Sequence, residues 1–334
     1  MKQIPVIICI DVEPDEQDFD PVARSEWVGF LEAYKLMSSL RPKLEQATGS
    51  SVHFCWFLRM DPQIAFGYGS AKWVGERHGR ILKELELKGD ELGLHMHAQR
   101  WDGASRTWIA DYGNQEWVSN CLQSSFEAFQ SFFGRPCESF RFGDYWINND
   151  SVELIDKLGA KYDLTVEPGI RTTPSLSRLT GVWPDYSSAP DHPYRPSQDD
   201  YQRPNMKSGR KLWMIPLSGG RYEGPKALRL WRLKRIARGL GFDRQGHHEA
   251  SRAALDIAPD IFRKLVEGLL KISNARYLAF VVRTDACIRT PEKFNLQENI
   301  DFLHSCSSVS RLRFNTPQNA LALMGHLTDN AGQE

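Results

Sequence analysis

Ile8-Cys9-Ile10-Asp11-Val12-Glu13-Pro14-Asp15 is an apolar run that ends in alternating carboxylates. The apolar part predicts a strand that is buried on both faces. Residues two apart in an extended chain point to the same side, so Asp11 and Glu13 are expected to emerge together at the strand's carboxyl end. Carboxylates paired in this way suit metal ligation or a base beside a ligand, and a solvated turn is the alternative interpretation.

Similar apolar runs recur along the chain, and segments with helical periodicity separate them. The expected strands are Pro5–Ile10, Val52–Leu58, Glu91–Leu94, Ser139–Phe142, Lys161–Val166, Leu212–Ile215, Tyr277–Val282 and Leu312–Phe314. The expected helices are Ser25–Thr48, Ala71–Lys88, Glu116–Phe133, Asp150–Leu158, Pro259–Ile272 and Pro291–His304. Buried strands that alternate with helices indicate a parallel sheet with both faces covered. Seven or eight such units predict an α/β fold, a distorted (β/α)7–8 barrel, with residues 1–334 forming one domain.

One long segment interrupts the alternation of strands and helices. Residues 169–210 are rich in proline, serine and aspartate. Long irregular segments inside a compact domain are usually functional. We therefore interpret 169–210 as a loop excursion over one mouth of the barrel and not as a linker between domains.

Composition excludes several classes of protein. The 334 residues contain 42 Lys plus Arg against 42 Asp plus Glu, a balance that argues against a general nucleic-acid binder. The six cysteines form no C-x-x-C pair, so zinc-ribbon and redox motifs are not indicated. The sequence predicts no transmembrane segment, and its first apolar run stops at Asp11, too soon for a secretory signal. A cytoplasmic location is the expectation.

A second group of polar residues follows the expected strand Glu91–Leu94. His95 and His97 have the two-residue spacing that places both rings on one face at the strand end. Neutral imidazoles in this arrangement are common ligands of zinc or a similar divalent ion. Either histidine alone would favour packing or hydrogen bonding instead.

A third group lies in Ser139-Phe140-Arg141-Phe142-Gly143-Asp144-Tyr145-Trp146. Arg141 ends an expected strand, where a guanidinium can orient a catalytic aspartate and keep it ionised. Tyr145 and Trp146, together with Trp101, are candidates for stacking on a sugar ring. A surface arginine beside core aromatic residues is the alternative interpretation.

These three groups, in this order, resemble the motifs of the polysaccharide deacetylase family, the NodB-homology or carbohydrate esterase 4 group. Ile215-Pro216-Leu217 and Phe314-Asn315-Thr316-Pro317 are similar to later parts of that barrel, so the resemblance spans about residues 5–320. It implies a distorted β/α barrel that hydrolyses N-acetyl groups with a divalent metal. Carried over to this chain, it implies that Asp11 is the base and Glu13 a metal ligand.

The chain departs from the family pattern at three places. The family's second histidine follows the first by four residues, where this chain has Gln99, so His97 has to replace it or the site is altered. Glu13 is one methylene longer than the usual aspartate ligand. The late family motif supplies a histidine general acid, whereas this chain reads Val281-Val282-Arg283-Thr284-Asp285. Arg283 or Asp285 then has another role, and the proton donor is either unassigned or a metal-bound water.

The resemblance thus implies a hydrolase that removes an acetyl group from an N-acetylated sugar or glycan precursor. Zinc or a related divalent ion would be held by Glu13, His95 and His97, with Asp11 as the base and Arg141 as its orienting partner. Two alternatives remain: a catalytically silent barrel that binds a glycan or an assembly partner, and a metal-independent amidohydrolase acting on a small cyclic amide. The sequence does not specify the sugar or the oligomeric state.

Two further features have weaker chemical meaning. Lys226–Arg238 is basic and amphipathic, and it suits either a solvated helix face or contact with phosphates or an anionic surface. His247 and His248 are adjacent, and adjacent histidines on a helix diverge by about 100°. We interpret that pair as structural or incidental.

Overall fold

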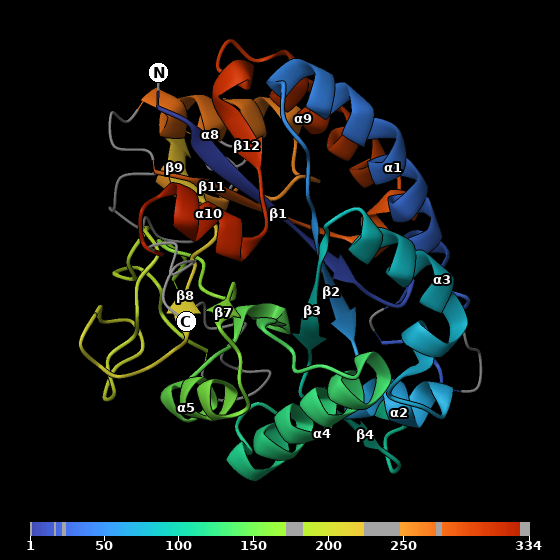
Figure 1. The fold of residues 1–334 in the computed structure, drawn as a ribbon. Coiled ribbons are helices and arrows are strands. Elements are labelled where there is room, and N and C mark those ends of the chain that lie inside the picture. The colour runs from blue at the N-terminus through green and yellow to red at the C-terminus, as the bar shows by residue number, and fades with distance from the viewer. Residues whose placement is uncertain are drawn as a thin grey trace, which may run out of the picture.

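The computed structural model describes residues 2–16, 18–21, 25–171, 183–223, 248–271 and 276–327. Within these ranges, the backbone alone is described for residues 220–223 and 248–252. Its centre is a sheet in which the strands follow the order β11-β1-β2-β3-β6-β7-β8, with β12 paired to β1 (Figure 1). The strands are β1 (Ile4–Val12), β2 (Cys55–Arg59), β3 (Glu91–Met96), β6 (Ser139–Phe142), β7 (Tyr162–Asp163), β8 (Trp213–Met214), β11 (Leu278–Arg283) and β12 (Leu312–Phe314). Their described pairings are parallel. The strands expected from the sequence are these, so the predicted α/β barrel is confirmed.

The barrel is distorted where β8 and β11 would meet. Irregular extended segments bridge these two strands. Leu217 N donates to Val166 O at 2.8 Å, and Ser218 N donates to Ala279 O at 2.9 Å. Further along the same edge of β11, Leu255 N donates to Val281 O at 2.8 Å. These bonds satisfy backbone groups that an open sheet edge would leave exposed.

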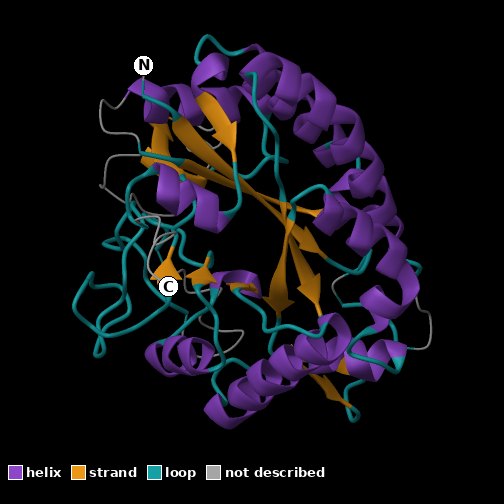
Figure 2. Cartoon of the chain, in the orientation of Figure 1, coloured by secondary structure: helices purple, strands orange, loops and turns teal. Residues whose placement is uncertain are grey.

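Helices cover much of the outer face of the sheet, and strands fill the centre (Figure 2). They are α1 (Val28–Thr48), α2 (Pro62–Tyr68), α3 (Trp73–Leu87), α4 (Gln115–Phe133), α5 (Asn149–Lys157), α8 (Pro259–Lys271), α9 (Glu292–Ser305) and α10 (Pro317–Leu323). Short 3-10 turns are η1 (Gly143–Tyr145), η2 (Thr284–Ile288) and η3 (Val309–Arg311). In the part of the chain that is described, no helix offers an apolar stretch long enough to cross a bilayer.

The structure contains elements that the sequence analysis did not predict. Helices α2 and α10 have only seven residues each, too short for a clear helical period. Their start signals are nevertheless present, because Asp61 and Thr316 cap them and proline follows each cap. Two antiparallel hairpins were also not predicted. One joins β4 (Gln99–Asp102) to β5 (Thr107–Ala110), and the other joins β9 (Gly219–Glu223) to β10 (His248–Arg252).

Helix α1 begins at Val28, three residues later than predicted. The carboxylate of Asp15 accepts hydrogen bonds from Val28 N at 3.0 Å and Gly29 N at 2.7 Å. It thereby caps the helix from a distant position, whereas Trp27 at the local cap position is left-handed and makes no side-chain cap. A local search for capping residues could not find this start, because the capping side chain comes from the loop after β1.

Alternate residues of each long strand face two different cores. On β1, Val6, Ile8 and Ile10 pack against the helices, whereas Ile7 and Cys9 face the barrel interior. On β11, Ala279 and Val281 likewise face the interior, while Phe280 packs outward. This period of two decides which residues at the strand ends point into the barrel.

The described part of the predicted loop excursion packs against the turn after β6. Trp183 Nε1 donates to Asp144 O at 2.8 Å, and the Tyr186 hydroxyl donates to Tyr145 O at 2.7 Å. These side chains are almost completely buried, so the segment is fixed to the barrel here. Residues 172–182 of the predicted excursion lie outside the described residues.

A buried carboxylate ties three elements together at the amino end of β3. Arg41 on α1 donates to both oxygens of Asp90, at 2.9 and 2.7 Å. Phe54 N and Trp56 Nε1, at the start of β2, each donate to the same carboxylate at 3.0 Å. Asp90 therefore accepts four hydrogen bonds in an environment without solvent, where such bonds are strong.

We expect Asp90→Ala to lower the free energy of unfolding by about 3–5 kcal/mol, because it leaves the buried Arg41 guanidinium without its partner. Urea denaturation monitored by circular dichroism measures this loss. Lys157→Ala is the control, since it breaks an exposed ion pair with Glu153 and is expected to cost less than about 1 kcal/mol. Equal losses in the two variants would contradict a structural role for Asp90.

Asp163 on β7 is a second buried carboxylate. It accepts from Thr165 N and Thr165 Oγ1, both at 2.9 Å, and Thr165 Oγ1 accepts from Phe142 N at 2.9 Å. Burial raises the pKa of Asp163 to about 7, although the bonds from Thr165 lower it. Between the unfolded pKa near 4 and this value, the folded chain holds a proton that the unfolded chain has lost.

Stability should therefore fall as the pH rises through this window. We expect the free energy of unfolding of the wild type, relative to Asp163→Asn, to decrease by about 2–3 kcal/mol between pH 5 and pH 8. Parallel urea titrations of both proteins across this range provide the measurement. A difference that does not change with pH would show that Asp163 is ionised throughout.

Candidate metal centre

The polar residues predicted from the sequence meet at the carboxyl ends of the strands. Asp11, Glu13, His95, His97 and Arg141 all continue the inward-facing alternation of their strands, and all line one pocket. The pocket and its mouth hold about 440 Å³. The carboxyl face is where barrel enzymes place their active sites, so this pocket is the candidate site.

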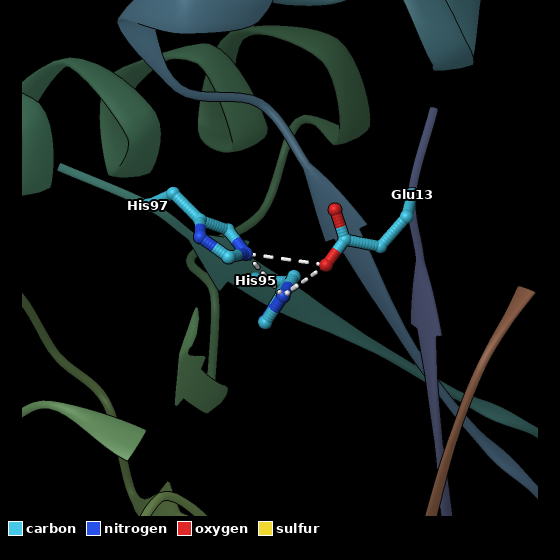
Figure 3. A group of neighbouring side chains, drawn as sticks. All are labelled: Glu13, His95 and His97. Carbon is cyan, nitrogen blue, oxygen red and sulfur yellow. Dashed lines mark hydrogen bonds and ion pairs between the residues drawn. The ribbon is translucent and has the colours of Figure 1, made fainter. Parts of the chain in front are cut away.

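Glu13, His95 and His97 direct one donor atom each toward a common point (Figure 3). Glu13 Oε1 lies 3.0 Å from His95 Nε2 and 3.1 Å from His97 Nε2, and the two Nε2 atoms are 3.0 Å apart. All three side chains are buried. The structure thus brings together the three residues predicted as ligands.

The outer nitrogens of both histidines face hydrogen-bond acceptors. His95 Nδ1 lies 3.2 Å from the backbone oxygen of Arg141, and His97 Nδ1 lies 3.1 Å from Asp144 Oδ2. A carbonyl or carboxylate oxygen only accepts, so each Nδ1 is the donor. In a neutral ring, Nε2 then carries a lone pair directed at the common point. Carboxylate and carbonyl partners of this kind orient histidine ligands of metals.

With both rings neutral, the three converging lone pairs suit a bound cation, which would replace the proton that the group otherwise holds. A tetrahedral zinc ion with bonds of about 2.0–2.2 Å separates its ligand atoms by about 3.3–3.5 Å. The observed separations of 3.0–3.1 Å need to widen by only a few tenths of an ångström. Two imidazoles and one carboxylate, with the pocket opening beside them, fit a zinc site that keeps one position for water.

Charges in the pocket also fit a divalent cation. The acidic and basic lining residues other than histidine and Tyr145 are four carboxylates and two guanidinium groups: Asp11, Glu13, Asp144, Asp256, Arg141 and Arg283. With both histidines neutral this lining carries two negative charges in excess, and a divalent ion would balance them.

The pKa values of His97 and Glu13 reflect the same excess of negative charge. Burial and Arg59 lower the pKa of His97, but Asp144 and Glu13 outweigh them and raise it to about 9. Burial alone would raise the pKa of Glu13, yet neighbouring cations hold it well below its usual value. In the absence of a metal the three-residue group therefore keeps a proton, which a metal ion would displace.

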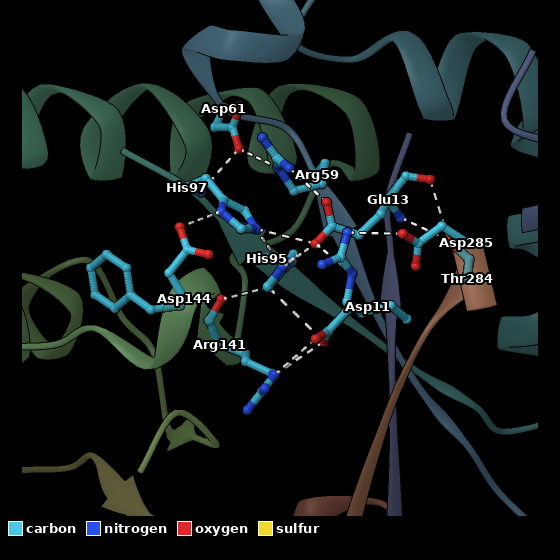
Figure 4. A network of polar contacts seen from close by, with 12 residues as sticks. Asp11, Glu13, Arg59, Asp61, His95, His97, Arg141, Asp144, Thr284 and Asp285 are labelled. Carbon is cyan, nitrogen blue, oxygen red and sulfur yellow. Dashed lines mark hydrogen bonds and ion pairs between the residues drawn. The ribbon is translucent and has the colours of Figure 1, made fainter. Parts of the chain in front are cut away.

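Glu13 is held by contacts on both its backbone and its side chain (Figure 4). Arg59, fully buried at the end of β2, donates from NH1 to Glu13 Oε2 at 2.8 Å, which leaves Oε1 to face the histidines. Thr284 Oγ1 accepts from Glu13 N at 2.9 Å and contacts Glu13 O at 3.2 Å. The longer side chain of glutamate is thus fixed in one position.

Sequence reasoning missed Arg59 and Asp61. Arg59 Nε bonds to Asp61 Oδ2, and the same oxygen accepts from His97 N at 3.2 Å. Asp61 therefore connects the capped start of α2 to the backbone of a candidate ligand. The available signals were an arginine that ends an apolar strand and the Asp61-Pro62 helix start.

Asp11 lies beside the three donors and faces Arg141. Arg141 Nε is 3.1 Å from each carboxylate oxygen of Asp11, and its NH1 donates to Leu164 O at 2.6 Å. Asp11 Oδ1 is 4.0 Å from His95 Nδ1, beyond hydrogen-bond distance. The predicted pairing of Arg141 with Asp11 is therefore present, and Asp11 is separate from the candidate ligands.

The turn after β6 closes one side of the pocket. Gly143 packs so closely on His97 that a Cβ atom there would lie 2.2 Å from Nε2. Asp144 and Tyr145 follow with φ of 54° each, a left-handed conformation that costs energy in residues with side chains. Tyr112 donates its hydroxyl to Asp144 Oδ2 at 2.9 Å. The sequence analysis quoted Asp144 but gave it no role.

The predicted sugar-stacking residues lie in different places. Tyr145 lines the pocket. Trp146 is buried against Tyr112, with ring centroids 5.1 Å apart, and Trp101 stacks on the exposed Phe66 at 6.0 Å. Among the described residues that line the pocket, Tyr145 is therefore the aromatic one.

The remaining residues from the sequence analysis lie away from the donors or outside the description. Gln99 is buried in the β4–β5 hairpin opposite Ala110 and is not in the three-residue group. Lys226–Arg238 and His247 lie outside the described residues, and the side chain of His248 is not described.

The fold is shared with solved structures of low sequence identity. A protein of Parabacteroides distasonis described as a glycoside hydrolase/deacetylase matches with a TM-score of 0.54 and 11% identity, over 93% of this chain and 69% of that one. The chain has the glycoside hydrolase/deacetylase-type barrel. Two further solved structures are similar to this chain and are described as polysaccharide deacetylases. One is from Mycobacterium smegmatis (TM-score 0.49, 15% identity, 100% of this chain and 94% of that one), and the other is from Pseudomonas aeruginosa (0.48, 11%, 99% and 93%). Comparisons of the sequence with family models and with curated proteins found no match.

Gly143→Ala tests the packing of His97. The new methyl group would overlap the imidazole ring, so His97 has to move away from Glu13 and His95. We expect zinc affinity, measured by competition with a chromophoric chelator, to fall by at least about tenfold, the scale seen when support of a metal ligand is lost.

Gly103→Ala is the matched control, because a Cβ atom at Gly103 meets nothing within 4 Å. Its zinc affinity should equal that of the wild type. A Gly143→Ala protein that binds zinc normally would show that His97 is not a ligand in this position.

Proposed function

We propose that this chain is a divalent-metal-dependent hydrolase that removes the acetyl group from an N-acetylated sugar or glycan precursor. The observation that carries the proposal is the convergence of Glu13, His95 and His97 beside an aspartate that is oriented by an arginine. The deacetylase-type barrel adds support through the fold alone.

Zinc or a related divalent ion would be held by Glu13, His95 and His97, and when bound it acts as a Lewis acid that acidifies water and polarises a carbonyl group. The residues of the chain determine where that chemistry takes place. Arg59 holds Glu13, while Asp144 and the Arg141 carbonyl hold the two imidazoles. A rigid donor set of this kind costs little reorganisation during the reaction.

Asp11 is the proposed general base. Its carboxylate is ordered by Arg141 and lines the same pocket as the three donors, so water in the pocket can approach it. When water adds to the acetyl carbonyl carbon, a C–O bond forms and the water proton passes to an oxygen of Asp11. The C–N bond then breaks, and the leaving nitrogen takes that proton. The products are acetate and a free amino sugar.

Tyr145 is the proposed contact for the sugar ring. It is the described aromatic residue that lines the pocket, and aromatic faces stack on the apolar face of sugars. Its left-handed backbone is held by the bond from Tyr186 to its carbonyl oxygen. A divalent ion would balance the negative charge of the pocket lining, and a pocket without net charge suits an uncharged acetamido sugar.

Two variants separate the base from the metal. Asp11→Asn should retain zinc at wild-type stoichiometry but lower kcat for acetate release by about 10²–10⁴-fold, the usual contribution of a general base. His95→Ala should lose zinc and hydrolysis together. Acetate release from N-acetylglucosamine oligosaccharides and metal analysis of the purified proteins are the two measurements.

Asp301→Asn, an exposed carboxylate on α9, is the control and should behave like the wild type. Activity that survives exhaustive chelation would favour a metal-independent amidohydrolase instead. A protein that takes up no zinc and releases no acetate would favour a silent binding barrel.

A further inference from the structure

We propose that Arg283 forms an anion-binding wall of the pocket and stabilises the oxyanion that develops during acyl transfer. The role in catalysis rests on the proposed hydrolase function. The anion-binding property does not, because it follows from the position of the guanidinium group and its charge.

Arg283 is the last residue of β11 and continues the inward alternation of Ala279 and Val281. In the β1–β11 ladder it pairs with Asp11, so it stands on the side of the pocket next to the proposed base. Its Nε lies 3.8 Å from Glu13 Oε1, the donor oxygen of the candidate metal centre. The guanidinium is therefore within reach of a group bound between Asp11 and Glu13.

Exposure distinguishes Arg283 from the other two arginines of the site. Arg59 has no exposed side-chain surface and lies behind Glu13, and the Arg141 side chain is only 3% exposed against Asp11. The Arg283 side chain is 30% exposed and lines the pocket. Of these three guanidinium groups, Arg283 is the one that a ligand entering from solvent can contact.

A chain of ion pairs fixes the position of Arg283. Its NH2 group donates to Asp285 Oδ2 at 3.0 Å, and the same oxygen lies 2.7 Å from Arg289 NH2. Helix α1 packs against this turn so closely that a Cβ atom on Gly29 would lie 2.6 Å from Thr284 O. This packing opposes movement of η2, so the ion pairs orient the guanidinium before any ligand arrives.

The chemistry of arginine defines the role. A guanidinium group stays protonated at any ordinary pH and only donates hydrogen bonds, so Arg283 cannot act as a general acid or base. It can donate charge-assisted hydrogen bonds to a tetrahedral oxyanion or to a product carboxylate. The ligand class is thus a small oxyanion such as acetate or its tetrahedral analogue.

Methylphosphonate is a suitable probe, because it is a tetrahedral anion with the methyl group of an acetyl substrate. Its binding to the zinc-loaded protein is measured by isothermal titration calorimetry. We expect Arg283→Gln to weaken binding by at least about tenfold, the scale of a hydrogen bond to a charged group, and Arg283→Lys to lie between the two. Zinc content, measured on the same samples, should stay at the wild-type value.

Arg263→Gln is the matched control. Arg263 is an exposed arginine on α8 that pairs with Glu298 and is not among the residues that line the pocket, so this variant should bind methylphosphonate within about twofold of the wild type. An Arg283→Gln protein with normal zinc content and wild-type affinity for methylphosphonate would overturn the proposal, as would equal losses in the Arg283→Gln and Arg263→Gln proteins.

Kinetics then separate this proposal from the proposed function. If acetamido sugars are hydrolysed, Arg283→Gln should lower kcat by about 10²–10³-fold with KM within threefold, as expected for loss of an oxyanion donor. An unchanged kcat would exclude the oxyanion role. If the wild type hydrolyses none of these sugars, the proposed function fails, and the calorimetric comparison still decides whether Arg283 binds anions.

Discussion

The site depends on the two-residue alternation of the barrel strands. Each strand that reaches the pocket has small or apolar residues facing the interior along its length and a polar residue at its carboxyl end. On β1 the interior-facing residue two positions before Asp11 is Cys9, and on β11 the one two positions before Arg283 is Val281. Because parallel strands end at the same face, residues more than 250 positions apart meet in one pocket. A shift of one residue in any of these registers would turn its polar group outward.

The two-residue alternation of the strands explains which parts of the fold and of the site could be predicted from the sequence. The strands, the longer helices and the inward direction of Asp11, Glu13, His95, His97 and Arg141 all follow from local periodicity. The short helices, the hairpins and the distant cap of α1 by Asp15 did not, since they depend on few residues or on contacts between remote segments. The roles of Trp101 and Trp146 could not be predicted because aromatic residues serve cores and ligands equally well.

Arginine is used in three different ways within a few ångströms. Arg59 is fully buried and holds a candidate ligand, Arg141 orders the proposed base, and Arg283 faces the pocket. Arg59 and Arg141 each bond to a buried carboxylate of the site, so removing either would leave that negative charge poorly compensated, whereas Asp285 would keep Arg289 if Arg283 were removed. Burial and direction decide these roles, and neither was visible in the residue type.

The two left-handed residues after β6 connect the centre to the segment that packs against this turn. Asp144 holds His97 through its side chain, and its backbone oxygen is held by Trp183. Tyr145 faces the pocket, and its backbone oxygen is held by Tyr186. During divergence of such a barrel, mutations that remodel this segment would also move Asp144 and Tyr145, and with them the support of His97 and one wall of the pocket. The shape of the pocket and the position of a candidate ligand would then change together.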